Sequence, residues 1–324
     1  MLRGKIVQVT NKRLPALDSL RFFAIAVIIL SHLEYLKDTV IGDFYWIHLH
    51  NANWGVDFFF MLSGFGLYYS LSGKIFDCDV KNSVFFAIKK IKKIYPLYIF
   101  SLLICLPYNL IVPDMHIEAV IVRFVLNLTL LQSAFGMTAL SHGINGVCWF
   151  LSTLFICYLF TPKLVVFIKN RCLTVKRTLS ALFICFGLIL ALSAVFLYLQ
   201  DILNEIVGRP YFNDFFYGSP YIRVFYVIFG MLLANLNLML KVSETDLTFW
   251  ECFCVIFIIA YFLFRNTLNV TPICLRSIDI FCAASILFLF SFEHGLISKN
   301  ISDSQLLYSC GGGIVCTSSY YITQ

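Results

Sequence analysis

The sequence predicts an all-α protein: a polytopic transmembrane helical bundle of about 8–10 spans whose amino terminus lies in the cytoplasm. The first observation is composition, since 60% of the 324 residues are hydrophobic and 13% are charged. A soluble domain has about half apolar and a quarter charged residues. The second is that apolar runs close to the ~20 residues needed to cross a bilayer recur along the chain. The third is that lysines and arginines gather in alternate connections, as they do in cytoplasmic loops.

Eight apolar segments are predicted to span the membrane, with room for a ninth from Gln305 onwards. The first is longer than the core of a signal peptide and is followed by no small-residue cleavage site, so we expect it to be retained. The eight segments are residues 16–35, 53–72, 94–112, 144–167, 179–200, 221–240, 249–264 and 273–292.

The connections between these segments predict their orientation. Those after the second and fourth segments are rich in lysine and arginine and belong in the cytoplasm. Those after the first and fifth are acidic and face outward. This alternation requires that residues 115–135, which carry Glu118, Arg123, Asn127 and Gln132, do not cross the membrane. We expect an interfacial or re-entrant helix there.

Several classes of site and partner are disfavoured by the sequence. The 12 cysteines never fall in a paired metal-ligand spacing, so we expect no metal site and no permanently bound cofactor. The net charge of +6 is not gathered on a polar domain with interleaved aromatic residues, so we expect no nucleic acid partner. No internal repeat is visible, which weakens a transporter function without excluding it.

Two ionisable residues in the first segment are candidates for function. Arg21 and His32 are eleven positions apart, so in a helix they share one face with about 16 Å between them along the axis. Imidazole in an apolar span suits proton transfer near neutral pH. Alternatively, Arg21 is an interfacial anchor and His32 makes a hydrogen bond between helices.

Asp57 lies near the outer end of the second segment, at about the depth of His32. A carboxylate that accepts a hydrogen bond from one imidazole nitrogen fixes the tautomer and makes the other nitrogen a stronger base. The alternative is that Asp57 caps the start of its helix. Ser63, Gly64 and Gly66 in the same segment are interpreted as small residues that let helices approach closely.

A known family shares these motifs. LDSLR at 17–21, followed after ten residues by His32, is similar to the opening signature of acyltransferase-3 proteins. WGVDFFFMLSGF at 54–65 resembles the family's second block. IYPLY at 94–98, WFLS at 149–152 and the segment from Ser219 to Gly230 follow in the family's order. The resemblance covers residues 17–292 of what we take to be a single membrane domain over 1–324.

The resemblance implies an enzyme of the bacterial inner membrane that moves acyl groups, usually acetyl, from a cytoplasmic donor to envelope sugars. We therefore expect an O-acetyltransferase whose donor substrate is acetyl-CoA. The acceptor is a polysaccharide or lipid-linked oligosaccharide of an O-antigen of lipopolysaccharide, a capsule or an exopolysaccharide. Two alternatives remain open: another acyl donor, or a carrier or flippase for a lipid-linked sugar, in which the charged residues would line a pathway.

Within this interpretation His32 and Asp57 are the catalytic residues, with His32 acting as base or forming an acyl-histidine. Arg21, Lys90, Lys92 and Lys93 are expected to hold the donor phosphates. The lysines equally fit positive-inside anchoring, and lysine lacks the planar fork with which the family's usual arginines grip phosphate.

The remaining candidates lie later in the chain. Trp149 is expected either to stack on a sugar ring or to belong to an interfacial aromatic belt. Arg223 is expected to polarise an acyl carbonyl or hold a sugar phosphate, or else to act as an anchor. Arg276 and Asp279, three residues apart, are predicted to neutralise each other inside the membrane.

The end of the chain departs from the family pattern. Residues 305–324 contain the three consecutive glycines 311–313, each of which costs a helix roughly 1 kcal/mol relative to alanine. A regular span beyond Tyr308 is therefore disfavoured. We expect this segment to be atypical, as in a truncated protein, and weak or absent activity is a further alternative.

Overall fold

The computed structural model describes residues 14–50, 53–75, 79–111, 116–240 and 246–303, and all regular structure in these ranges is helical. Each of the eight predicted spans forms one long helix. They are α1 (Pro15–Ser31), α3 (Asn53–Leu71), α5 (Tyr95–Ile111), α8 (Trp149–Arg171), α9 (Val175–Val207), α10 (Pro220–Met239), α11 (Thr248–Phe264) and α12 (Pro272–Phe290). The all-α polytopic fold class is confirmed. The expected ninth span and the glycine run lie outside the described residues.

Among the described residues, fewer helices than the expected 8–10 are long and apolar enough to cross a membrane. Within the described ranges α8, α9, α10, α11 and α12 are long and apolar enough, and a sixth span results if α4 (Val80–Ile91) and α5 count as one, bent by 70°. α1 has only 17 residues because the chain after Ser31 turns into a 3-10 helix, η1 (Glu34–Asp38). α3 has 19 residues, and Asp57 lowers its apolar character.

Local sequence explains where several helices begin. Pro15 occupies the first turn of α1, where a missing N–H costs nothing, and Asp18 in the same turn complements the helix dipole. α12 begins in the same way with Pro272, and the hydroxyl of Thr271 accepts a hydrogen bond from the Cys274 N–H at 3.3 Å. Asp79 caps α4 by accepting from the Asn82 N–H at 2.8 Å.

The chain folds into two compact units, and α8, α9 and α10 each contribute residues to both. Unit 1 comprises Met1–Lys74, Ile168–Ile184 and Tyr226–Gln324; unit 2 comprises Ile75–Phe167 and Cys185–Phe225.

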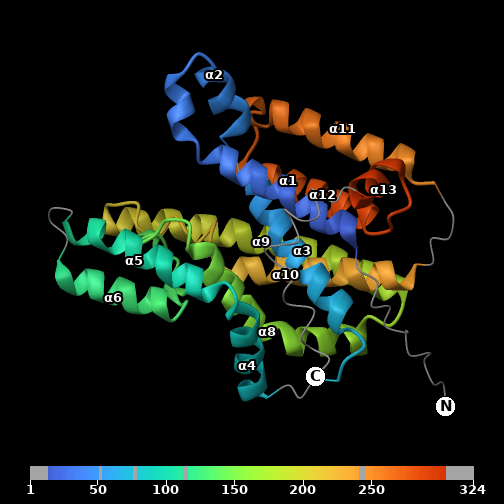
Figure 1. Cartoon of the computed structure of the whole chain (residues 1–324), viewed down its shortest axis with the longest axis horizontal. Coiled ribbons are helices and arrows are strands. Elements are labelled where there is room, and N and C mark those ends of the chain that lie inside the picture. Colours follow the sequence, from blue (N-terminus) through green and yellow to red (C-terminus); the bar gives the residue numbers. More distant parts are fainter. Residues whose placement is uncertain (1–13, 51–52, 76–78, 112–115, 241–245, 304–324) are drawn as a thin grey trace. The chain divides into compact units, whose positions relative to one another are not determined.

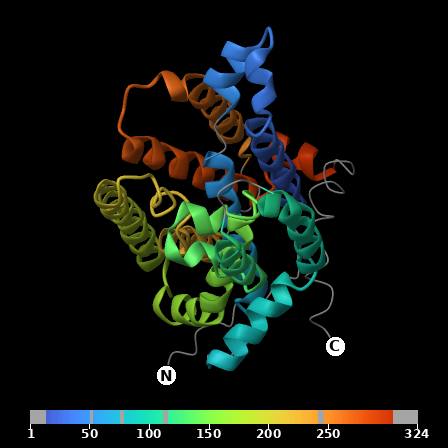
Figure 2. The same cartoon turned by 90° about the vertical axis from the view of Figure 1, so that its left-hand side faces the viewer.

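In unit 1, α3 packs against α1 and α12, and α11 packs against α12 (Figure 1). The helix α13 (Leu296–Asp303) contacts α1 and α11. The connection after α1 folds η1, α2 (Gly42–Phe44) and the π-helix η2 (Tyr45–Leu49) into a cap at the end of α1 (Figure 2).

Small residues let helices of unit 1 approach one another, as the sequence predicted for Gly64. A side chain at Gly64 would meet the backbone of Val227 on α10, and one at Gly230 would meet the backbone of Met61 on α3. Any larger residue at either position would push the two helices apart.

The short helix α13 was not predicted, and a buried carboxylate holds its start. Glu251 of α11 accepts hydrogen bonds from the N–H groups of Gly295 at 3.1 Å and Ser298 at 3.0 Å. These are donors that a helix terminus leaves unpaired, so a carboxylate there stabilises the helix. Nearby, Ser19 of α1 donates to the carbonyl of Ile301 at 3.1 Å, which ties α13 to α1.

In unit 2, α5 packs against α6 (Ile117–Leu128), which occupies the segment expected not to cross the membrane. Twelve residues rise about 18 Å, too little to span a bilayer. Of the polar residues of this segment, Asn127 and Gln132 are buried, Arg123 is half-buried and Glu118 is exposed. The buried Gln132 donates to the hydroxyl of Tyr98 at 3.2 Å, and that hydroxyl donates to the Asn127 carbonyl at 2.8 Å.

Candidate functional site

His32 lies at the carboxy-terminal end of α1 with its side chain exposed. Its Nδ1 is 2.7 Å from the carbonyl oxygen of Ile28 and 3.2 Å from the hydroxyl of Ser31. A carbonyl oxygen only accepts hydrogen bonds, so Nδ1 must carry the proton. The lone pair of the imidazole is therefore on Nε2, where it can accept a proton from a substrate.

Asp57 is only 2% exposed and lies on α3 inside unit 1. It is the fifth residue of α3, beyond the first turn, so it does not cap that helix. Its charge acts on Asp279 of α12, which packs against α3. The partner of His32 Nδ1 is the Ile28 carbonyl, and the pairing of His32 with Asp57 stays a prediction.

Arg21 lies on α1 and forms an ion pair with Asp18, one turn earlier. Its guanidinium lies beside Gly66 of α3, and the side chain is 16% exposed. Asp18 therefore neutralises part of the charge that was expected to meet a donor phosphate.

A second charged pair in unit 1 joins the 3-10 turn after α11 to the middle of α12. Arg265, in the 3-10 turn η4 (Arg265–Thr267), places Nη2 2.8 Å and Nε 3.2 Å from the two oxygens of Asp279. The hydroxyl of Tyr261 donates to Asp279 at 2.8 Å. The sequence had paired Asp279 with Arg276; the structure gives it a two-pronged contact with Arg265 across the hairpin.

The three candidate lysines lie in unit 2, at the bend between α4 and α5. Lys92 and Lys93 are exposed there. Lys90 is half-buried and holds its ammonium 5.6 Å above the ring of Phe86. Arg21 belongs to unit 1, so its expected neighbourhood with these lysines stays a prediction.

Trp149 and Arg223, also in unit 2, are brought together by Tyr217. The ring of Trp149 lies 5.1 Å from that of Tyr217, and the guanidinium of Arg223 lies 5.3 Å above the same ring. Arg223 also donates from Nε to the Tyr217 carbonyl at 2.9 Å. Both are buried, with 6% of Trp149 and 1% of Arg223 exposed, so neither presents an open platform.

His142 and Asp214 form an ion pair beside Trp149 that the sequence did not predict. Nε2 of His142 is 3.1 Å from Asp214, and Nδ1 is 2.7 Å from the carbonyl of Gly146. Burial alone would lower the pKa of His142, but the hydrogen bond and charge of Asp214, with the Gly146 carbonyl, raise it above the usual value. Because both nitrogens face acceptors, the imidazolium form suits this site, and His142 is a clamp rather than a base.

Sequence reasoning thus located the charged residues of the first two spans but missed their partners. Arg265 and Asp279 lie at similar distances on either side of the turn at Thr271, a symmetry from which pairing across a helical hairpin could have been predicted. His142 and Asp214 are 72 residues apart in two irregular connections, and no local pattern relates them.

The comparison with known families agrees with the motifs and the helical fold. The acyltransferase-3 family model, described as an acyltransferase domain, matches residues 14–302 and so runs through both units. No curated protein and no solved structure matches the chain. The match includes the helix with Arg21 and His32, the helix with Asp57 and the connection with His142. The chain therefore belongs to the acyltransferase-3 family and is a multi-pass membrane acyltransferase.

Proposed function

We propose that this protein is an O-acetyltransferase of the bacterial inner membrane. It takes the acetyl group of acetyl-CoA from the cytoplasm and transfers it to a hydroxyl of an envelope polysaccharide or lipid-linked oligosaccharide. The observation that carries the proposal is the hydrogen bond from His32 Nδ1 to the Ile28 carbonyl at 2.7 Å, because it reserves Nε2 for the acceptor hydroxyl. Family membership supplies the reaction class.

In the proposed reaction, Nε2 of His32 takes the proton of the acceptor hydroxyl while its oxygen attacks the thioester carbonyl. An ester bond forms and the carbon–sulfur bond breaks. The sulfur leaves and receives the proton from the imidazolium, which returns His32 to its starting state. If transfer instead passes through an acyl-histidine, the same Nε2 lone pair is the nucleophile.

The donor is assigned to the cytoplasmic side. Arg21 lies on the helix of His32, about 16 Å before it along the axis. The exposed Lys92 and Lys93 carry charge suited to the phosphates of CoA, with the half-buried Lys90 beside them. Arg21 is already paired with Asp18, so it contributes to phosphate binding only if its guanidinium contacts the carboxylate and the phosphate together.

We also assign Trp149 and Arg223 to substrate binding. Their burial against Tyr217 suggests that they shape an inner wall, because neither side chain is open to solvent. Stacking of Trp149 on a sugar would require Tyr217 to move, whereas positioning of the Tyr217 segment requires no rearrangement.

The test uses purified protein in liposomes with acetyl-CoA and an envelope glycan preparation. We expect His32→Ala to insert normally and to lose transfer by about 10²–10⁴-fold, the usual contribution of a general base. His116→Ala is the matched control, since His116 is exposed and makes no capping hydrogen bond on α6. Equal transfer by His32→Ala would remove His32 from the mechanism. Movement of the glycan without release of CoA would show a carrier instead.

A further inference from the structure

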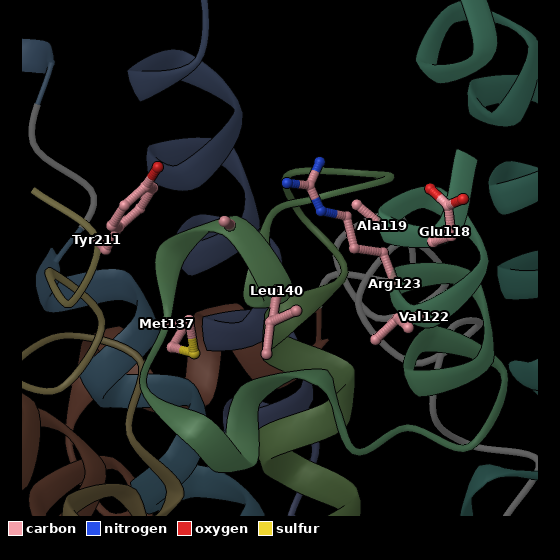
Figure 3. A pocket seen from close by; sticks show the side chains of 8 residues that line it. Glu118, Ala119, Val122, Arg123, Met137, Leu140 and Tyr211 are labelled. Atoms are coloured by element: carbon pink, nitrogen blue, oxygen red, sulfur yellow. The ribbon is translucent and has the colours of Figure 1, made fainter. Parts of the chain in front are cut away.

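A cavity of about 410 Å³ opens in unit 2. None of the candidate catalytic or substrate-binding residues lines it. This volume lies within the range of small-molecule sites. Figure 3 shows the side chains around it. They come from α6, from α7 (Thr138–Ser141) with the residue before it, and from the connection after α9: Glu118, Val122, Arg123, Met137, Leu140 and Tyr211.

The walls of this cavity are fixed by contacts within the unit. Glu118 and Val122 are four residues apart on α6, so both face the cavity, one helical turn apart. The carbonyl of Tyr211 accepts a hydrogen bond from the Thr138 N–H at 2.7 Å, which joins two walls. The hydroxyl of Tyr211 accepts from Arg209 at 3.1 Å, which sets the ring. The site is thus formed before any ligand arrives.

A close contact also places the side chain of Arg123. A Cβ at Gly143 would lie 2.7 Å from Cδ of Arg123, so only glycine leaves room for the arginine stem. Gly143 directly follows His142, and His142 pairs with Asp214 in the connection that carries Tyr211. The same clamp therefore holds two sides of the cavity.

The lining combines groups that suit a neutral polyhydroxylated ring. Glu118 supplies a carboxylate with no hydrogen bond or ion pair among the described residues, and Arg123 supplies a guanidinium. Their charges balance, which disfavours a polyphosphate such as the nucleotide of CoA. Met137, Leu140 and the ring of Tyr211 provide apolar surface for the faces of a sugar.

From these observations we infer that the cavity binds a pyranose unit of the acceptor glycan. Tyr211 stacks on the sugar, and Glu118 and Arg123 bond its hydroxyl groups. The inference rests on the proposed acceptor class. The predicted topology agrees with it, because the connections that line the cavity and the end of α1 that carries His32 are assigned to the same, outer side of the membrane.

Binding is measured without acetyl-CoA, so that its result does not depend on transfer. The probes are methyl pyranosides of glucose, galactose, mannose and rhamnose, and saturation transfer from the full-length protein in detergent reports contact. We expect at least one probe to bind, with affinity about tenfold lower for Tyr211→Ala and for Glu118→Gln. The matched controls Tyr198→Ala and Glu205→Gln change exposed residues of α9 in the same unit and should bind like wild type.

The inference is overturned if no probe binds wild-type protein, if both cavity variants bind as wild type does, or if CoA displaces the sugar. Failure of the proposed function looks different. If His32→Ala binds the probes normally and still transfers acetyl groups, the cavity assignment stands and the catalytic assignment fails. If Tyr211→Ala transfers acetyl groups as fast as wild type does at limiting glycan, the cavity is not the acceptor subsite, and this result too overturns the inference.

Discussion

Asp57 places a carboxylate in the interior of unit 1, where an isolated charge would be expensive. Its neighbour across the α3–α12 contact is Asp279, which is already bound to Arg265. Two roles for Asp57 follow. It supports positive charge on His32 through space, as the sequence predicts, or it balances the buried positive charge of Arg265 beside Asp279.

Asp57→Asn separates these two roles because it keeps the volume and removes the charge. If Asp57 supports the imidazolium, transfer should fall by about 10- to 100-fold, and the pH at which activity is half-maximal should move. The measurement is a pH–rate profile of both proteins beside Asp43→Asn, a change at an exposed acid of α2. An unchanged profile with a lower melting temperature would assign Asp57 to charge balance alone.

At the residue scale, helical periodicity places residues along one helix, but it does not determine side-chain rotamers or contacts between segments. A shared face for Arg21 and His32 follows from helical periodicity. The hydrogen bond of His32 depends on a side-chain rotation that turns Nδ1 back onto Ile28, and no sequence pattern specifies that rotation. The ion pair of Arg21 with Asp18, by contrast, has the three-residue spacing that helices favour and was predictable.

At the scale of elements, the hairpin of α11 and α12 depends on one buried ion pair. Arg265 and Asp279 are 5% and 2% exposed. Removing one member of a buried pair leaves the other charge without compensation, which costs about 3–5 kcal/mol. Asp279→Asn should therefore destabilise unit 1 strongly. Arg265→Met combined with Asp279→Leu should recover most of the loss, because neither member of the pair is left as a charge without its partner.

Thermal unfolding in detergent micelles checks this expectation for the α11–α12 hairpin. Asp303→Asn, at the exposed end of α13, is the control for loss of a carboxylate. If the double variant melts no higher than Asp279→Asn, the pair contributes specific packing and not charge compensation.

The connection after α9 is held to α7 by the clamp between His142 and Asp214. The pKa of His142 is raised in the folded protein, so the stability that this pair contributes is fully present below the unfolded value of about 6.5. That stability is lost as the pH rises through the raised pKa.

Hydrogen exchange of the amides of Phe215 and Gly218, corrected for intrinsic rates, should report this loss as faster opening at alkaline pH. Asp214→Asn should abolish the pH-dependent step, because its amide cannot favour the imidazolium. A step of equal size in that variant would show that another group titrates.

At the scale of the whole molecule, the sequence predicted all eight long helices, because a long apolar segment inside a bilayer can satisfy its backbone hydrogen bonds within itself by forming a helix. It did not predict the division into two units, since neither unit is continuous in sequence. It also missed the cavity, whose walls come from two connections of unit 2, the one between α5 and α8 and the one between α9 and α10. The site residues recognised from motifs are those that one helix places; the residues that were missed depend on packing between segments.

The length of α9 links the enzyme to the lipid around it. Its 33 residues rise about 50 Å, whereas the hydrocarbon core of a bilayer is about 30 Å thick. The last turns bind the following connection, since Asn204 accepts from the Phe212 N–H at 2.8 Å and Gln200 from the Phe216 N–H at 3.4 Å. A thicker membrane covers more of these turns or changes the tilt of the helix. Bilayer thickness therefore sets how far the Tyr211 connection stands above the lipid, and with it which part of a long surface polymer meets the enzyme.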